Sequence, residues 1–204
     1  MSASREPLPR AFYERDAVRL ARALLGRTLV HETREGTVAA RIVEVEAYRG
    51  PADRAAHSYG GRRTPRNEVM WGPAGHAYVY FVYGMHWCLN AVAAKPGAPE
   101  AVLFRAAEPL EGKDLARRRR GRDVSDEGLL RGPANLCRAL GVGRAQNGAD
   151  LTSGGLVILA GDEVPPRCIR ASPRIGVDYA GDDALMPWRF FVADSPAVSG
   201  RRRG

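Results

Sequence analysis

The pattern of apolar and polar residues predicts a chain built mainly of strands, with three helices. From Asp16 to the stop at Gly26, apolar side chains recur at spacings of three and four, which places them on one face of a helix. Later segments alternate between apolar and polar residues, as half-buried strands do. The predicted strands cover residues 27–33, 37–47, 76–83, 86–92, 101–106, 155–160, 168–171, 174–179 and 188–192, and the other two predicted helices cover 114–120 and 133–140.

Segments rich in Gly, Pro and polar residues separate these elements. The longest is 50–73, and an irregular segment of that length in a compact domain is usually functional or disordered. We predict one α+β domain over residues 11–198, with a mostly antiparallel sheet and helices at its edges. Residues 1–10 and 199–204 are expected to be flexible tails. The shorter connections are a turn at 34–36, a turn-like loop at 94–100 and a polar link at 121–127.

Length and cysteine content narrow the class of protein. The 204 residues suffice for one core, and no run of eighteen or more apolar residues exists, so we expect neither a membrane span nor a membrane partner. No apolar segment follows the charges of the N-terminus, so no signal peptide is expected. The three cysteines form no CxxC or CxxH pair, which indicates neither a disulfide framework nor a structural zinc site. We therefore expect a cytoplasmic location.

The net charge of +8 favours a polyanionic partner, nucleic acid above all. Nearly all of this charge is arginine, however, and an arginine bias with abundant Ala and Gly is also typical of GC-rich genomes. Lys95 and Lys113 are the only lysines, which removes most candidates for a Schiff-base nucleophile. The arginine clusters at 117–120 and 201–203 are weak signals, because such runs are usually solvated and touch phosphates without specificity.

Candidate chemistry concentrates between residues 41 and 90. An apolar strand ends there in Glu44 and Glu46, and tyrosines gather nearby although only 7% of the chain is aromatic. A carboxylate at the end of a half-buried strand lies in a low dielectric beside a ring, a setting that suits acid–base work. The alternative for Glu46 is a surface glutamate or an ion pair with an arginine. Glu44 lies on the same face, and the pattern does not exclude it.

Other polar residues in this region have structural as well as functional interpretations. His57 lies in a loop, where a lone histidine is usually a surface or hydrogen-bonding residue. The spacing of the histidines matches neither a metal-binding helix pair nor a zinc-deaminase motif, so no metal is expected. Asn90 disfavours a strand unless its amide is used, and Arg105 among apolar neighbours needs a carboxylate or a phosphate.

The predicted hairpin of residues 76–92 alternates rings and aliphatic side chains. Strand propensity alone explains most of that pattern. It does not explain Tyr83 and Met85 at the turn, where large apolar side chains are open to water. Proteins that bind the minor groove use such side chains as wedges between base steps.

Four segments, in order, resemble the alkyladenine (3-methyladenine) DNA glycosylase family. They read EVEAYRGPADRAAHSYGGRRTPRN, YVYFVYGMHWCLN, AVLFRAAEPLEG and GPANLCRALG. The resemblance is to the branch with its own mixed α/β fold, not the helix-hairpin-helix branch, and it runs from Leu20 to Ser195. It implies a curved antiparallel sheet similar to a formyltransferase C-terminal domain, and a monofunctional enzyme of base excision repair without a cofactor.

The resemblance also implies roles for individual residues. The family flips an alkylated or deaminated purine out of duplex DNA and hydrolyses its N-glycosidic bond. Glu46 resembles the carboxylate that positions and deprotonates the water, and Arg105 the arginine that helps to hold it. The other matches are Tyr48 and His57 with the pair that sandwiches the base, Tyr80 with the ring at the pocket edge, Tyr83 with the side chain that fills the vacated stack, Met85 beside it, and Asn90 with the residue that crowds a guanine 2-amino group. Arg49 departs from the aliphatic residue expected after EAY, which bears on phosphate contact at the pocket mouth and not on the chemistry.

Three functions compete on the residues alone. The first is a monomeric glycosylase that releases 3-methyladenine, 7-methylguanine, hypoxanthine or ethenoadenine from double-stranded DNA. The second is a non-catalytic binder of damaged or distorted DNA, and the third is a small-molecule hydrolase or transferase. The complete glutamate–tyrosine–histidine set favours the first over the second, and the apolar hairpin turn favours it over the third. The sequence does not rank the lesions.

Overall fold

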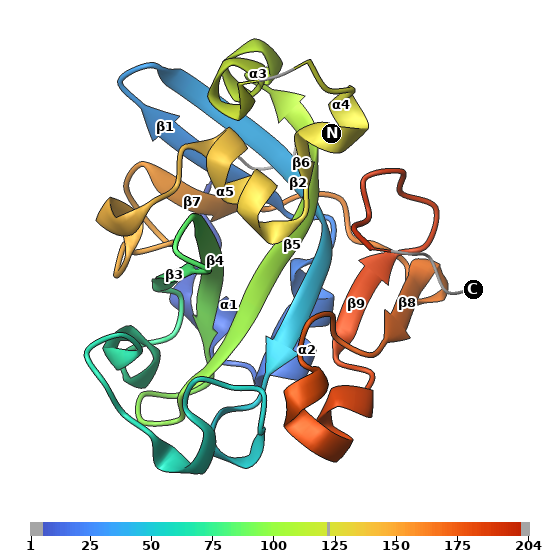
Figure 1. Ribbon diagram of the computed structural model, residues 1–204. Helices are drawn as coiled ribbons and strands as arrows, with labels where there is room; N and C mark the ends of the chain where they lie inside the picture. Colours follow the sequence, from blue (N-terminus) through green and yellow to red (C-terminus); the bar gives the residue numbers. More distant parts are fainter. Residues whose placement is uncertain (1–5, 122, 201–204) are drawn as a thin grey trace.

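The computed structural model describes residues 6–121 and 123–200, which form a curled, antiparallel sheet with short helices around it (Figure 1). The main path of the sheet runs β3-β4-β5-β2-β1-β7, with β6 paired to β5 and β9 paired to both β2 and β8. The predicted α+β class and the single antiparallel domain are confirmed. The strands are β1 Thr28–Thr33, β2 Gly36–Tyr48, β3 Ala77–Val82, β4 His86–Ala93, β5 Glu100–Glu111, β6 Leu130–Arg131, β7 Leu156–Leu159, β8 Ile169–Ser172 and β9 Arg189–Val192.

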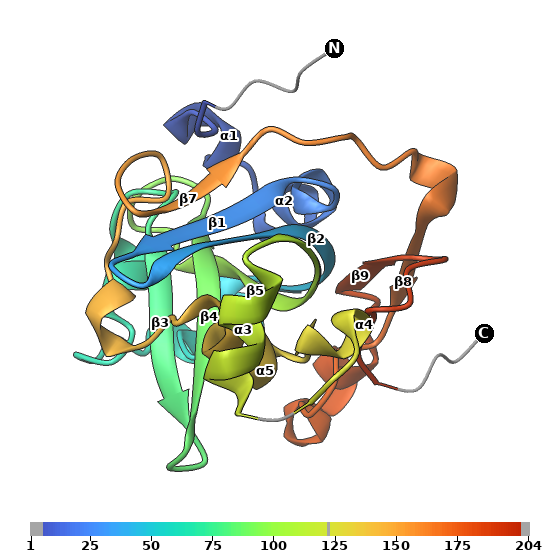
Figure 2. The ribbon, with the colours of Figure 1, turned by 90° about the horizontal axis from the view of Figure 1, so that it is seen from above.

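Short helices cover the sheet and its edges. The helix α2 packs against β2 and β5, and α5 packs against β4 and β5 from the other side (Figure 2). The α-helices are α1 Arg10–Tyr13, α2 Ala17–Leu24, α3 Lys113–Arg120, α4 Asp126–Leu129 and α5 Pro133–Leu140. The 3₁₀ helices are η1 Gly50–Ala52, η2 Tyr59–Gly61, η3 Glu68–Trp71, η4 Arg144–Gln146, η5 Pro166–Cys168 and η6 Asp178–Leu185. Within the described residues, no helix is long and apolar enough to span a bilayer.

Local signals explain why α2 begins and ends where it does. The Asp16 carboxylate accepts a hydrogen bond from the backbone N–H of Arg19 at 3.0 Å and caps the first turn. Gly26 follows the helix with φ +85°, and a Cβ there would lie 2.1 Å from the carbonyl oxygen of Asp162. Only glycine fits that position, so the predicted stop has a steric cause.

The two central strands are irregular at the point that later carries the site. In β2, Ile42 pairs with Ala107 and Glu44 with Ala106, so Val43 between them is an extra residue. In β5, the irregularity falls on Arg105, because the next pair joins Val45 to Phe104. Bulges of this kind re-aim side chains next to functional sites.

Some predicted elements need correction. The strand predicted at 174–179 is wrong: Gly176 is left-handed with φ +76°, and the 3₁₀ helix η6 begins within this segment. Arg174, at the start of this segment, has its side chain buried in an ion pair with Asp53. The last two residues of the polar link predicted at 121–127 belong to the short helix α4, which begins at Asp126.

The packed domain is longer than predicted at both ends. The backbone N–H of Leu8 donates to the carbonyl of Ile158 at 2.8 Å, and Leu8 is buried. Ser199 is buried too, and its hydroxyl donates to the Glu44 carboxylate at 2.9 Å. The expectation of tails at 1–10 and 199–204 is therefore wrong for these residues. Residues 1–5 and 201–204 of the predicted tails lie outside the described residues.

Candidate active site

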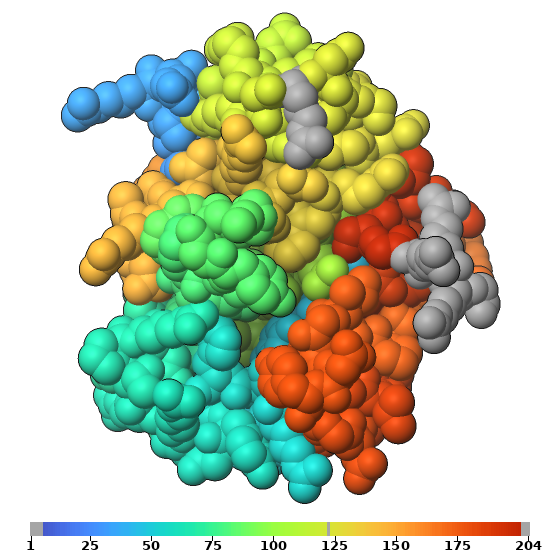
Figure 3. Space-filling view, in the orientation of Figure 1, coloured from blue at the N-terminus to red at the C-terminus, as the bar shows by residue number. Residues whose placement is uncertain are grey.

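A cavity of about 340 Å³ opens between the 50–73 loop, the β3–β4 hairpin and the segment before η6. Figure 3 shows the hollow between these three parts of the surface. Six side chains singled out from the sequence line it: Tyr48, His57, Tyr80, Tyr83, Asn90 and Arg105. The fold therefore brings together residues that are far apart in the chain.

Glu46 lies directly behind the cavity wall, with a side chain that is 0% exposed. Its Oε2 accepts a hydrogen bond from the Tyr48 hydroxyl at 2.9 Å, and its Oε1 accepts one from the Ile175 N–H at 2.8 Å. The Arg105 guanidinium lies 3.1 Å from the same Oε1. All three partners line the cavity, so the carboxylate is oriented by groups that a ligand would touch.

Glu44 holds Arg105 from the other side. The Arg105 Nε donates to Glu44 Oε1 at 3.0 Å, and Arg189 Nε donates to the same oxygen at 2.7 Å. The Ser199 N–H and hydroxyl complete the shell of this carboxylate. Two buried carboxylates thus face two buried guanidiniums, a balanced cluster that fixes Arg105 beside Glu46.

One side of the cavity is aromatic and uncharged. His57 Nδ1 lies 2.7 Å from the Tyr78 hydroxyl, and the His57 ring meets the Tyr80 ring edge to face at 4.6 Å. Burial, reinforced by Arg66 and Arg62, lowers the pKa of His57 to about 4, so the imidazole is neutral at neutral pH.

On the opposite side, Tyr48 is fixed by a buried ion pair that the sequence did not indicate. Arg174 donates two hydrogen bonds to Asp53, at 2.6 and 2.8 Å, and both side chains are 0% exposed. The Arg174 guanidinium also lies over the Tyr48 ring, 4.7 Å from its centroid. Burial raises the pKa of the Tyr48 hydroxyl, with Glu46 as the next cause. Asp53 and Arg174 are 121 residues apart in the chain, so no local sequence pattern indicates that they pair.

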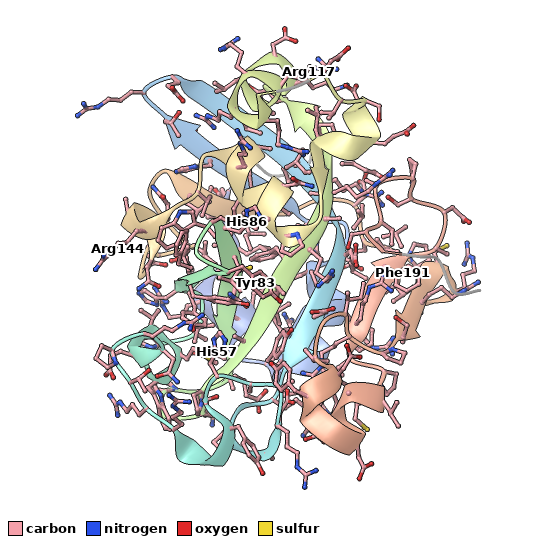
Figure 4. The ribbon with its side chains drawn as sticks, in the orientation of Figure 1. His57, Tyr83, His86, Arg117, Arg144 and Phe191 are labelled. Carbon is pink, nitrogen blue, oxygen red and sulfur yellow. The ribbon has the colours of Figure 1, made fainter. Side chains whose placement is uncertain are left out.

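The hairpin turn places Tyr83 at the mouth of the cavity. Tyr83 is 81% exposed with φ +53°, and Met85 beyond it is 67% exposed and does not line the cavity. In Figure 4, Tyr83 lies in the centre of this face between His57 and His86. The expected pair of exposed apolar side chains is present in the structure.

The side-chain hydrogen bond of Asn90 accounts for an asparagine at this position in a strand. It is buried opposite Tyr78 in the β3–β4 ladder, and its Nδ2 donates to the Tyr78 carbonyl at 3.0 Å. The amide is used, as the sequence argument requires. Asn90 therefore presents a fixed polar side chain to the inner part of the cavity.

The arginine cluster at 117–120 is largely structural. Arg117 pairs with Asp114 and Asp126, and Arg119 donates to the carbonyl of Leu140 at 2.7 Å. Figure 4 places Arg117 far from His57 and Tyr83. The second cluster, 201–203, lies outside the described residues. Among residues 6–121 and 123–200, no group of three or more His, Cys, Asp or Glu could hold a metal ion.

Comparison with known proteins places the chain in a class. The family described as methylpurine-DNA glycosylase (MPG) matches residues 11–196. A protein of Methanocella arvoryzae is 51% identical over 97% of this chain and 98% of its own length. Relatives from Desulfitobacterium hafniense and Streptomyces avermitilis are each 48% identical, over 94% and 96% of this chain and 98% and 92% of their own lengths. All three carry the name "Putative 3-methyladenine DNA glycosylase".

By this family and these relatives, the chain is a DNA glycosylase, a hydrolase of DNA repair that cleaves N-glycosidic bonds. The chain belongs to the methylpurine-DNA glycosylase family. The resemblance read from the sequence is confirmed at the level of the family and of the enzyme class.

Proposed function

We propose that the cavity receives an alkylated or deaminated purine flipped out of double-stranded DNA, and that Glu46 activates the water that releases it. The observation that carries this proposal is the position of Glu46: a buried carboxylate whose three partners all line one aromatic cavity. A volume of about 340 Å³ lies within the usual range for small-molecule sites.

The neutral rings suit a cationic base. Alkylation gives the purine a positive charge, which strengthens its attraction to electron-rich ring faces. His57 is uncharged at neutral pH because its pKa is about 4, and burial keeps the Tyr48 and Tyr80 hydroxyls protonated by raising their pKa values. No positive ring therefore repels the lesion.

The reaction needs one water molecule and one general base. The C1′–N bond breaks as its electron pair leaves with the purine, and the water oxygen bonds to C1′ while its proton passes to Glu46. The carboxylate also stabilises the positive charge that develops on the sugar, and Arg105 keeps it oriented. Neither lysine lines the cavity, so no lysine amine is placed there to form a Schiff base.

Base release provides the direct test. The protein is incubated with duplexes that carry 3-methyladenine, 7-methylguanine, hypoxanthine or ethenoadenine, and the freed bases are identified by chromatography. We expect at least one free purine and an abasic site in the strand. Tight binding with no free base would instead establish the alternative, a non-catalytic binder of damaged DNA.

Glu44 is expected to act as a positioning residue through Arg105. We predict that Glu44→Gln slows single-turnover base release on the order of 100-fold, because a poorly placed Arg105 misaligns the carboxylate and its water. The affinity for lesion DNA should change little, since Glu44 does not line the cavity. Separate measurements of rate and affinity test this split, and a proportional loss of both would assign Glu44 to the fold alone.

Tyr83 is expected to fill the space that the flipped nucleotide leaves. We predict that Tyr83→Ala weakens binding to lesion duplex by about 1–3 kcal/mol, the usual contribution of one base–aromatic stack. The free energy of unfolding should stay within about 0.5 kcal/mol, because the side chain is 81% exposed. Titration of a fluorescent duplex measures the affinity, with Leu110→Ala as an exposed control on β5. Unchanged affinity would remove Tyr83 from the DNA interface.

Three expectations stay predictions. The lesion that the enzyme prefers, its monomeric state and its cytoplasmic location each need a separate measurement. The base-release assay ranks the lesions, and sedimentation of the free protein and of its DNA complex gives the oligomeric state. The proposed engagement of DNA through the single face around Tyr83 supports the monomer.

A further inference from the structure

A second cavity, of about 300 Å³, lies beside the base cavity and has no part in the chemistry described above. The two cavities share His57, Ala55 and Tyr179 as walls. The second one is basic: Arg54, Arg62 and Arg66 line it, together with Thr64 and Asn67. We call it the arginine cavity.

Two of the three guanidiniums in the arginine cavity have no acidic partner within residues 6–121 and 123–200. Arg62 makes no side-chain hydrogen bond or ion pair there, and Arg66 donates to the carbonyl of Phe81 at 3.1 Å and lies over the Tyr80 ring. The neighbouring Arg63 differs, because it pairs with Glu68 outside the cavity. The cavity thus keeps positive charge that no carboxylate of the described residues pairs with.

The loop that presents these arginines is fixed from within. Asn67 is buried, and its Oδ1 accepts hydrogen bonds from the N–H and hydroxyl of Thr64 at 2.7 and 3.2 Å. Its Nδ2 donates to the carbonyls of His57 and Arg62 at 3.0 and 2.9 Å. The backbone at Arg62 and Thr64 therefore needs no rearrangement to receive a ligand, which lowers the entropic cost of binding.

We propose that the arginine cavity binds a phosphodiester of the lesion-bearing strand, next to the flipped nucleotide. This inference rests on the proposed function, since the base cavity must hold that nucleotide. Guanidiniums without a carboxylate suit a phosphate, which forms charge-assisted hydrogen bonds with them. His57, Ala55 and Tyr179 are walls of both cavities, so the two cavities are adjacent. A base in one cavity and its own backbone phosphate in the other therefore fit a continuous strand. Such a contact sets position and not sequence.

The salt dependence of binding tests this contact. Arg62→Ala should reduce the slope of log K against log salt concentration by about 1, the effect of one lost phosphate contact. The matched control is Arg34→Ala, which removes the same charge from an exposed arginine in the β1–β2 turn, at the other end of the molecule in Figure 1. Arg34→Ala should leave the slope unchanged. Equal slopes for the two variants would overturn the proposal.

Neutral linkages identify the phosphate. A methylphosphonate is placed at one position at a time around the lesion, and the affinity is measured with wild type and with Arg62→Ala. At the contacted position the substitution should weaken wild-type binding and cause little further loss in Arg62→Ala, whereas the losses should add elsewhere. Additive losses at every position would contradict the assignment. If wild type releases no base from any lesion, the proposed function fails instead, and that assay is independent of the salt slopes.

Discussion

Replacement of Glu46 by glutamine is expected to lower the rate of base release by about 10²–10⁴-fold, the usual contribution of a general base. Glutamine has nearly the same shape, and its amide can still accept from the Ile175 N–H and donate to the Tyr48 oxygen. It cannot accept a proton from water, nor stabilise a positive sugar with its charge. The affinity for lesion DNA should therefore stay near the wild-type value.

Single-turnover kinetics and binding titrations on the same duplex separate the two effects. Glu111→Gln is the matched control, because it makes the same change at an exposed position at the end of β5. It should release base at the wild-type rate. A Glu46→Gln variant that loses binding and rate together, or keeps its rate, would refute the assigned role.

Replacement of Asp53 by alanine is expected to produce the largest loss of stability, about 3–5 kcal/mol in the free energy of unfolding. The change leaves the Arg174 guanidinium buried without its carboxylate, and it also removes acceptors for the N–H groups of Arg49 and Ala55. A buried charge without a partner keeps its full desolvation cost. Urea unfolding followed by circular dichroism measures the effect.

An exposed ion pair supplies the comparison. Asp114 pairs with Arg117 on α3 but is 87% exposed, so Asp114→Ala should cost less than about 1 kcal/mol. The double variant Asp53→Ala, Arg174→Leu should recover part of the lost stability, because it removes the buried charge as well. A loss below about 1 kcal/mol for Asp53→Ala would mean that solvent reaches Arg174 readily.

The elements that could be predicted from the sequence are those defined by local patterns. The helix 133–140 has a proline at its first turn and a glycine after its last, and the structure begins and ends α5 at those residues. The β3–β4 hairpin follows from alternation around Gly84. The strand predicted at 174–179 is wrong, because Arg174 at its start forms a buried ion pair with Asp53, which is distant in the chain.

The candidate site also contains both residues that local motifs indicate and contacts that they do not. Motifs in the sequence singled out Glu46, Tyr48 and His57 as candidates, because their neighbours in the chain carry a recognisable order. They did not identify Glu44 as the partner of Arg105, nor the support of Tyr48 by Arg174. Those contacts depend on two strand bulges and on a long-range ion pair, neither of which has a local signature.

Local order in the chain was thus enough to predict the antiparallel α+β class and the glycosylase family, and to single out candidate residues for the chemistry. The arrangement that makes them a site came from folding: a buried charge cluster around Arg105, a neutral His57, and a basic cavity beside the base cavity. The reason is physical. Residue type and periodicity act over a few positions, whereas burial, charge balance and the shift of a pKa depend on groups that meet only when distant segments pack together.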